Sequence, residues 1–117
     1  MADRQSGSPA LTELELAAVA TYFEGDAEFY QVFRDSAVAQ FPVDLQQGDK
    51  AELAGDAQAL RRAAHTLKGV LLTLGYSELS NFAKGVEQAA QHAAWQEAVA
   101  GWRELRARMV STFSLQP

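Results

Sequence analysis

Residues 57–75 read AQALRRAAHTLKGVLLTLG, and the spacing of apolar residues in this stretch decides the fold. The apolar side chains recur three or four residues apart, which is the period of one helix face. Gly55 and Asp56 precede the stretch as a helix stop and an N-cap, and Gly75 ends it. We therefore predict a helix over residues 57–74 whose buried stripe comprises Leu60, Ala63, Leu67, Val70, Leu71 and Leu74.

The rest of the chain favours helix as well. Alanine, leucine, glutamine and glutamate are common, β-branched residues are sparse, and there are only three prolines in 117 residues. This length suits one compact domain with a single core. Capping signals and apolar spacing predict four further helices, over residues 12–23, 26–53, 78–91 and 95–113.

Short connections make successive helices antiparallel neighbours. The predicted fold class is therefore all-α, an antiparallel up-and-down four-helix bundle with a short N-terminal capping helix, over residues 11–114. Residues 1–10 carry serine, glycine and proline without periodicity, which predicts a flexible tail. Pro42 predicts a kink in the second helix, Gly48 is an alternative break there, and Ser77 is the predicted cap of the fourth helix.

Charge and composition limit the function classes. The net charge of −5 and the pI near 4.9 argue against a nucleic-acid or anionic-membrane partner, because either would require a positive surface. The chain has no cysteine, which excludes disulfides and thiolate metal sites. No run approaches the roughly 20 apolar residues of a membrane span. We expect a soluble cytoplasmic protein.

His65 lies opposite the buried stripe. At about 100° per residue, the residues within about 60° of it are mostly polar or basic, so we predict that the ring faces water. Neutral imidazole offers a nucleophilic nitrogen, and the permanent charge of Lys68 would attract an anion such as a phosphoryl group. An ordinary solvated histidine is the plainer alternative. The neighbouring residues on this face are Gln58, Arg61, Arg62, Lys68, Gly69 and Leu72.

Gly69 lies on this polar side, although glycine inside a helix costs about 1 kcal/mol relative to alanine. Packing within a bundle should not need a glycine there. We interpret it as clearance for the acidic site of another protein that approaches His65. Leu72, an apolar residue on the polar face, is a candidate docking anchor, and Gln58, Arg61, Arg62 and Lys84 are candidate partner contacts. We also expect apolar residues of the first two predicted helices to contact the partner.

The sequence AHTLKG at residues 64–69, followed by LG at 74 and 75, resembles the signature of histidine-containing phosphotransfer (HPt) domains of bacterial two-component phosphorelays. The preceding GDAQALRRAA at residues 55–64 is also similar to that family. The resemblance implies that His65 accepts a phosphoryl group from a receiver-domain aspartate of a hybrid sensor kinase and passes it to the aspartate of a response regulator. It assigns electrostatic support to Lys68 and receiver clearance to Gly69.

The resemblance further implies a monomer that binds no cofactor or metal and has no ATP-dependent kinase activity of its own. The Mg²⁺ of the reaction is expected on the partner receiver domain. Val70 departs from the family pattern, in which a small polar residue often follows the glycine, and Leu71 and Leu72 stand where small residues are frequent.

Two other functions fit parts of the pattern. A helical adaptor could dock a kinase or response regulator without being phosphorylated. A dimerising histidine-kinase domain would need an ATP-binding domain downstream. His92 fits a cation at a helix end, and Trp95 and Trp102 fit core packing, so none of them is assigned chemistry.

Overall fold

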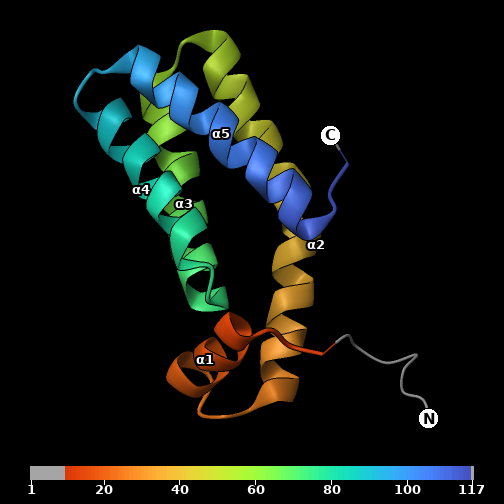
Figure 1. The fold of residues 1–117 in the computed structure, drawn as a ribbon. Coiled ribbons are helices and arrows are strands. Elements are labelled where there is room, and N and C mark those ends of the chain that lie inside the picture. The colour runs from red at the N-terminus through yellow and green to blue at the C-terminus, as the bar shows by residue number, and fades with distance from the viewer. Residues whose placement is uncertain (1–9, 117) are drawn as a thin grey trace.

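A computed structural model describes residues 10–116, and within this range the chain forms helices and no strand (Figure 1). The all-α prediction is confirmed, and every predicted helix is found with its ends shifted by no more than one residue. The predicted tail lies outside the described residues except for Ala10. The helices are α1 (Glu13–Tyr22), α2 (Ala27–Ala54), α3 (Ala57–Leu74), α4 (Ser77–Gln91) and α5 (Trp95–Phe113).

The helix ends follow from their capping residues. Thr12 and Glu15 form the predicted capping box of α1, and the Asp26 carboxylate accepts a hydrogen bond from the Phe29 amide at 2.9 Å. Gly75 ends α3 with a left-handed φ of 100°. The prediction for Ser77 is wrong, because Tyr76 takes the N-cap position of α4 without a side-chain cap.

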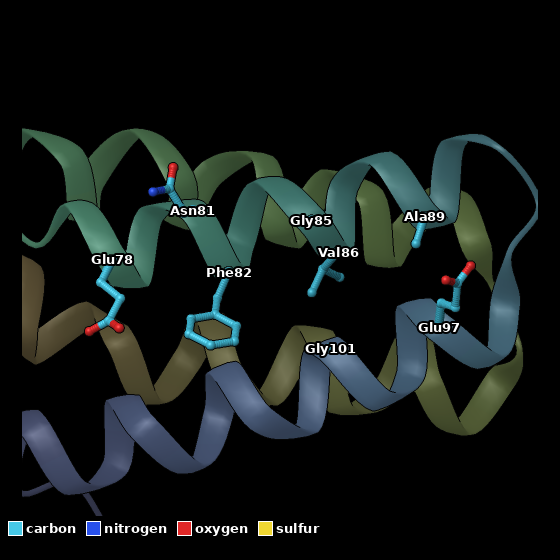
Figure 2. Close-up of a pocket in the computed structure, with 8 residues that line it drawn as sticks. All are labelled: Glu78, Asn81, Phe82, Gly85, Val86, Ala89, Glu97 and Gly101. Atoms are coloured by element: carbon cyan, nitrogen blue, oxygen red, sulfur yellow. The ribbon is translucent and has the colours of Figure 1, made fainter.

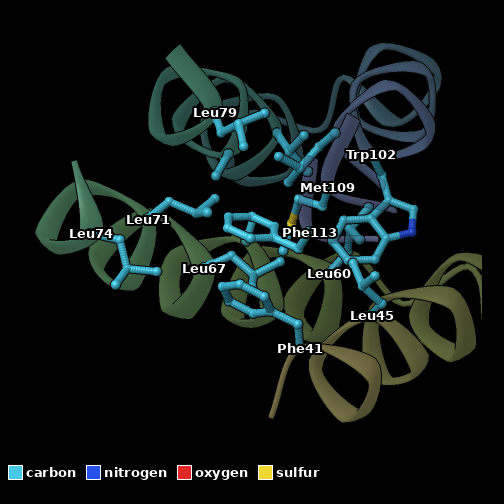
Figure 3. Packing of buried hydrophobic residues seen from close by; sticks show 14 of the residues in the cluster. Phe41, Leu45, Leu60, Leu67, Leu71, Leu74, Leu79, Trp102, Met109 and Phe113 are labelled. Carbon is cyan, nitrogen blue, oxygen red and sulfur yellow. The ribbon is translucent and has the colours of Figure 1, made fainter. Parts of the chain in front are cut away.

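The core lies between α3 and the helices around it. α3 packs against α2 and α4, α4 packs against α5, and α5 also contacts α2. Each fully buried large apolar side chain stabilises such a fold by about 1.5–3 kcal/mol. Val70, predicted in the stripe of α3, is only half-buried, whereas Ala64 is fully buried. Side chains from several helices meet in this core, including Phe41, Leu45, Leu60, Leu67, Leu71, Leu79, Trp102, Met109 and Phe113 (Figure 3).

α2 is one continuous helix that includes Pro42, and its ribbon changes direction along its length (Figure 1). The alternative break at Gly48 is not present. Gly48 is buried against the indole of Trp102, and a Cβ atom at this position would lie 2.0 Å from Trp102 Cζ2. The glycine therefore lets α5 approach the backbone of α2.

Polar contacts join α1 to the rest of the fold. The buried Glu15 carboxylate accepts hydrogen bonds from Arg34 Nε at 3.0 Å and from the Tyr76 hydroxyl at 2.5 Å. Burial alone would raise the pKa of Glu15, but the Tyr76, Thr12 and Arg34 contacts together hold the pKa below its usual value. These bonds link α1 to α2 and to the α3–α4 connection, beside the C-terminal end of α3 (Figure 1).

None of the helices in residues 10–116 is both long enough and apolar enough for a membrane crossing.

Replacement of Gly48 by alanine should lower the free energy of unfolding by about 1–3 kcal/mol, since the added methyl group overlaps the Trp102 ring. The matched control is Gly85→Ala, because no atom lies within 4 Å of an added Cβ there. That change should raise stability by up to about 1 kcal/mol through helix propensity. Urea unfolding of both variants measures the difference, and equal stabilities would refute the packing role of Gly48.

Candidate functional site

His65 projects from α3 into solvent. Its side chain is 63% exposed, as predicted from the sequence. One edge of the ring is nevertheless fixed, because Nδ1 lies 2.7 Å from Oε2 of Glu87 on α4. The imidazole is therefore oriented by a second helix and open to an approaching molecule.

Glu87 of α4 connects His65 and Lys68 of α3. Its second oxygen, Oε1, lies 2.8 Å from Lys68 Nζ, so a single carboxylate binds both His65 and Lys68. The Glu87 side chain is only 12% exposed. The hydrogen bond from Lys68 is the largest influence on the pKa of Glu87, and together with the bond from His65 it lowers that pKa despite the opposing effect of burial.

The ionised state of Glu87 determines which ring nitrogen of His65 is reactive. A carboxylate can only accept hydrogen bonds, so Nδ1 must carry a proton to complete the 2.7 Å contact. In the neutral imidazole the lone pair then resides on Nε2, the nitrogen that does not contact Glu87. The site presents one nucleophilic nitrogen in a defined orientation.

Close packing of α3 on α4 brings Glu87 within reach of His65. Ala64 and Ala83, one on each helix, are fully buried and occupy little space. The buried Ser80 hydroxyl on α4 donates a hydrogen bond to the Lys68 carbonyl of α3 at 2.9 Å. These contacts set the register of the two helices at the site.

Gly69 is exposed beside the site, and an added Cβ would meet no atom within 4 Å. Two other helical glycines, Gly48 and Gly101, differ in this respect. Gly48 adjoins Trp102, and a Cβ at Gly101 would lie 3.0 Å from Val86 Cγ2. Packing within the chain therefore explains Gly48 and Gly101 but not Gly69, in agreement with the prediction that the bundle does not need it.

Leu72 is 44% exposed and lies in a groove of about 250 Å³ between α1 and the C-terminal end of α3. Leu14 and Tyr22 of α1 line the same groove and are also exposed. Apolar residues of this helix were predicted to contact a partner, but the sequence did not single out Leu14 and Tyr22. The structure thus places Leu72 in an apolar surface shared by two helices, about 10 Å along the axis from His65.

The remaining predicted contacts surround His65 less closely. Arg61 donates a hydrogen bond to the exposed Gln58 at 2.9 Å, in the first turns of α3. Arg62 is exposed one turn before His65. Lys84 is exposed on α4. The lysine that pairs with Glu87 beside His65 is Lys68.

Glu87 was missed in the sequence, although a signal for it exists. It lies four residues after Ala83 and three before Ala90, both of which are buried on α4. A carboxylate on the apolar face of a helix requires a partner, because an unpaired buried charge is strongly unfavourable. Its nearest candidate partners on an adjacent antiparallel helix are His65 and Lys68.

No cluster of three or more histidine, aspartate or glutamate side chains within residues 10–116 is arranged to hold a metal ion. His92, the second histidine, is exposed and takes the C-cap position of α4.

The family model described as the Hpt domain matches residues 28–112. The chain belongs to the Hpt family. This match confirms the resemblance of AHTLKG to the family. Hpt domains carry phosphoryl groups in two-component signalling and interact with receiver domains. The match includes α3 and α4 in full, whereas α1 lies outside it. No curated protein and no solved structure matches the chain with significant similarity.

Proposed function

We propose that this Hpt domain is a phosphorelay intermediate in which His65 accepts a phosphoryl group from the aspartate of one receiver domain and donates it to the aspartate of a response regulator. The main support is the exposed imidazole whose Nδ1 is held by Glu87 at 2.7 Å. A merely solvated histidine would not need a buried carboxylate on a neighbouring helix.

The transfer step uses the free ring nitrogen. Nε2 attacks the phosphorus of the aspartyl phosphate, the N–P bond forms, and the P–O bond to the aspartate breaks, which releases its carboxylate. The ring retains the proton on Nδ1 and so gains positive charge, which the Glu87 carboxylate stabilises. Transfer to the second receiver reverses these changes.

Lys68 supplies positive charge beside the reacting group. Its ammonium has three donors, of which one is used by Glu87 at 2.8 Å, so others are available for phosphoryl oxygens. The reaction also needs the Mg²⁺ that we assign to the receiver domain. Within this scheme the chain positions the imidazole and neutralises charge on the phosphoryl group, and it has no ATP-dependent kinase activity of its own.

The docking surface combines clearance with apolar and basic contacts. Gly69 leaves space next to His65, and Leu72 with Leu14 and Tyr22 offers an apolar groove on one side. Arg61 and Arg62 lie on the other side along α3 and complement the acidic pocket of a receiver.

We assign the HPt domain to residues 11–114, because Glu15 joins α1 to Arg34 of α2 and to Tyr76. Within it, α2 to α5 form the antiparallel up-and-down four-helix bundle, supported by the short connections and the packing of successive helices. We propose that the protein acts in the cytoplasm as a monomer.

The His65→Gln variant should fold normally but accept no phosphate from a receiver domain charged on its aspartate. Glutamine removes the nucleophilic nitrogen, and the exposed position tolerates the change. Each receiver domain of the source organism is tested as a donor. At least one should place acid-labile, alkali-stable phosphate on the wild type, and none should label the variant. Labelling of the variant to the wild-type level would refute the assignment, and receiver binding without labelling of the wild type would indicate an adaptor.

The Gly69→Leu variant should weaken receiver binding by about tenfold or more, because the side chain would occupy the space into which the partner approaches. Its own stability should not fall, since no atom of the chain lies near the added Cβ. Gly69→Ala is the matched control with a smaller side chain and a smaller effect. Calorimetric titration with a receiver measures the affinities, and identical values for all three proteins would exclude the clearance role.

A further inference from the structure

A second hollow lies between α4 and α5, away from the histidine. It is a groove of about 390 Å³ whose apolar wall is formed by Phe82, Val86 and Ala89 of α4. Figure 2 shows the side chains of Phe82 and Val86 directed toward α5, with Gly85 between them and Gly101 opposite. The proposed phosphotransfer step uses none of these residues.

Gly85 keeps this groove open without serving the chain's own packing. It is exposed, and an added Cβ would meet no atom within 4 Å. Its neighbour across the groove, Gly101, differs because a Cβ there would press on Val86 at 3.0 Å. A glycine inside a helix costs about 1 kcal/mol relative to alanine, so Gly85 lowers helix stability with no gain in internal contacts.

The groove has acidic ends. The exposed carboxylates of Glu78 and Glu97 stand at its two ends in Figure 2. The groove extends along α4 from Glu78 to Ala89, which corresponds to about 16 Å or three helical turns. Arg108 lies over the Phe82 ring at 4.5 Å, and its charge is paired with Glu104 at 2.7 Å.

The groove and the phosphotransfer site lie on different sides of α4. Gly85 and Glu87 are two residues apart, which places them about 200° apart around the helix axis. Glu87 is directed toward α3 and contacts His65, whereas Gly85 faces the α4–α5 groove. A molecule in the groove would therefore leave the face that carries His65 accessible.

We propose that the α4–α5 groove is a second docking site, which binds an amphipathic helix with an apolar stripe between two basic residues spaced about three turns apart. The apolar wall accepts the stripe, the open space at Gly85 admits a side chain, and Glu78 and Glu97 pair with the two cations. The chain's net charge of −5 also attracts a basic partner.

A second copy of this chain is the weaker occupant. A two-fold arrangement that joined the grooves along their length would bring the carboxylates of Glu78 and Glu97 from both copies together, and like charges across an interface oppose association. A basic helix meets the same two carboxylates with opposite charge.

The experiment uses a panel of fluorescein-labelled helical peptides with a leucine and alanine stripe and two lysines spaced ten, eleven or twelve residues apart. A matched panel carries glutamate in place of each lysine. Fluorescence anisotropy against the full chain should show binding by the lysine panel, and weaker binding by the glutamate panel. Gly85→Leu should reduce the affinity at least about tenfold, because leucine fills the groove.

The controls separate the groove from the rest of the surface. Ala107→Leu adds the same side chain at an exposed position of α5 that does not line the groove, and it should bind as the wild type does. His65→Gln should also bind normally, so failure of the phosphotransfer proposal would leave this result unchanged. The substitutions Glu78→Lys and Glu97→Lys should each lower the affinity of the chain for the lysine peptides.

Four results would overturn the proposal. The lysine panel could fail to bind the wild type, or it could bind wild type and Gly85→Leu with equal affinity. The lysine and glutamate panels could bind equally well. Finally, the wild type could form a dimer in sedimentation equilibrium that Gly85→Leu abolishes, which would assign the groove to a second copy of the chain.

Discussion

Glu87 binds His65 and Lys68 with its two carboxylate oxygens, and the properties of the site depend on this contact between α3 and α4. The carboxylate is nearly buried, whereas the imidazole that it orients is mostly exposed. The buried Glu87 carboxylate thus holds the ring in place, and the exposed edge of the ring is the part that a partner can reach. The low-dielectric interface strengthens the hydrogen bond to Nδ1, and the solvent-facing edge of the ring keeps Nε2 available to a partner.

The packing of the bundle maintains that contact. Ala64 and Ala83 bring the two helices close together, and Ser80 bonds to the Lys68 carbonyl at the level of the site. On the far side of the core, Trp102 rests on the backbone of α2 at Gly48. The helical glycines thus have different explanations. Gly48 and Gly101 admit side chains of this chain, whereas Gly69 and Gly85 leave open surface, which we assign to two different partners.

The sequence predicts most of the fold because local signals agree with one another. The capping box at Thr12, the aspartate N-cap at Asp26 and the glycine stop at Gly75 are found in the structure. The prediction for Ser77 failed because Tyr76, whose amide closes the end of α3 on the Leu71 carbonyl, already accepts the first α4 hydrogen bond from Ser80; its hydroxyl also bonds to Glu15 of α1. No helical period could supply that contact between residues far apart in the chain.

The candidate site could be predicted only in part for the same reason. His65, Lys68, Gly69 and Leu72 share one helix face, so a helical wheel places them together. Glu87 comes from a different helix, and its meeting with His65 depends on the register of α3 against α4. The sequence also predicted apolar contacts from the first helix, but the structure was needed to show that Leu14 and Tyr22 lie beside Leu72.

The protonation of the His65 ring tests the central claim most directly. Long-range ¹H–¹⁵N correlation spectra, recorded at a pH where the imidazole is neutral, distinguish a protonated Nδ1 from a protonated Nε2. The account predicts that Nδ1 carries the proton in the wild type and that the Glu87→Leu variant, whose side chain has no acceptor for the Nδ1–H group, loses this preference. A neutral His65 with its proton on Nε2, or the same tautomer in both proteins, would contradict the role given to Glu87.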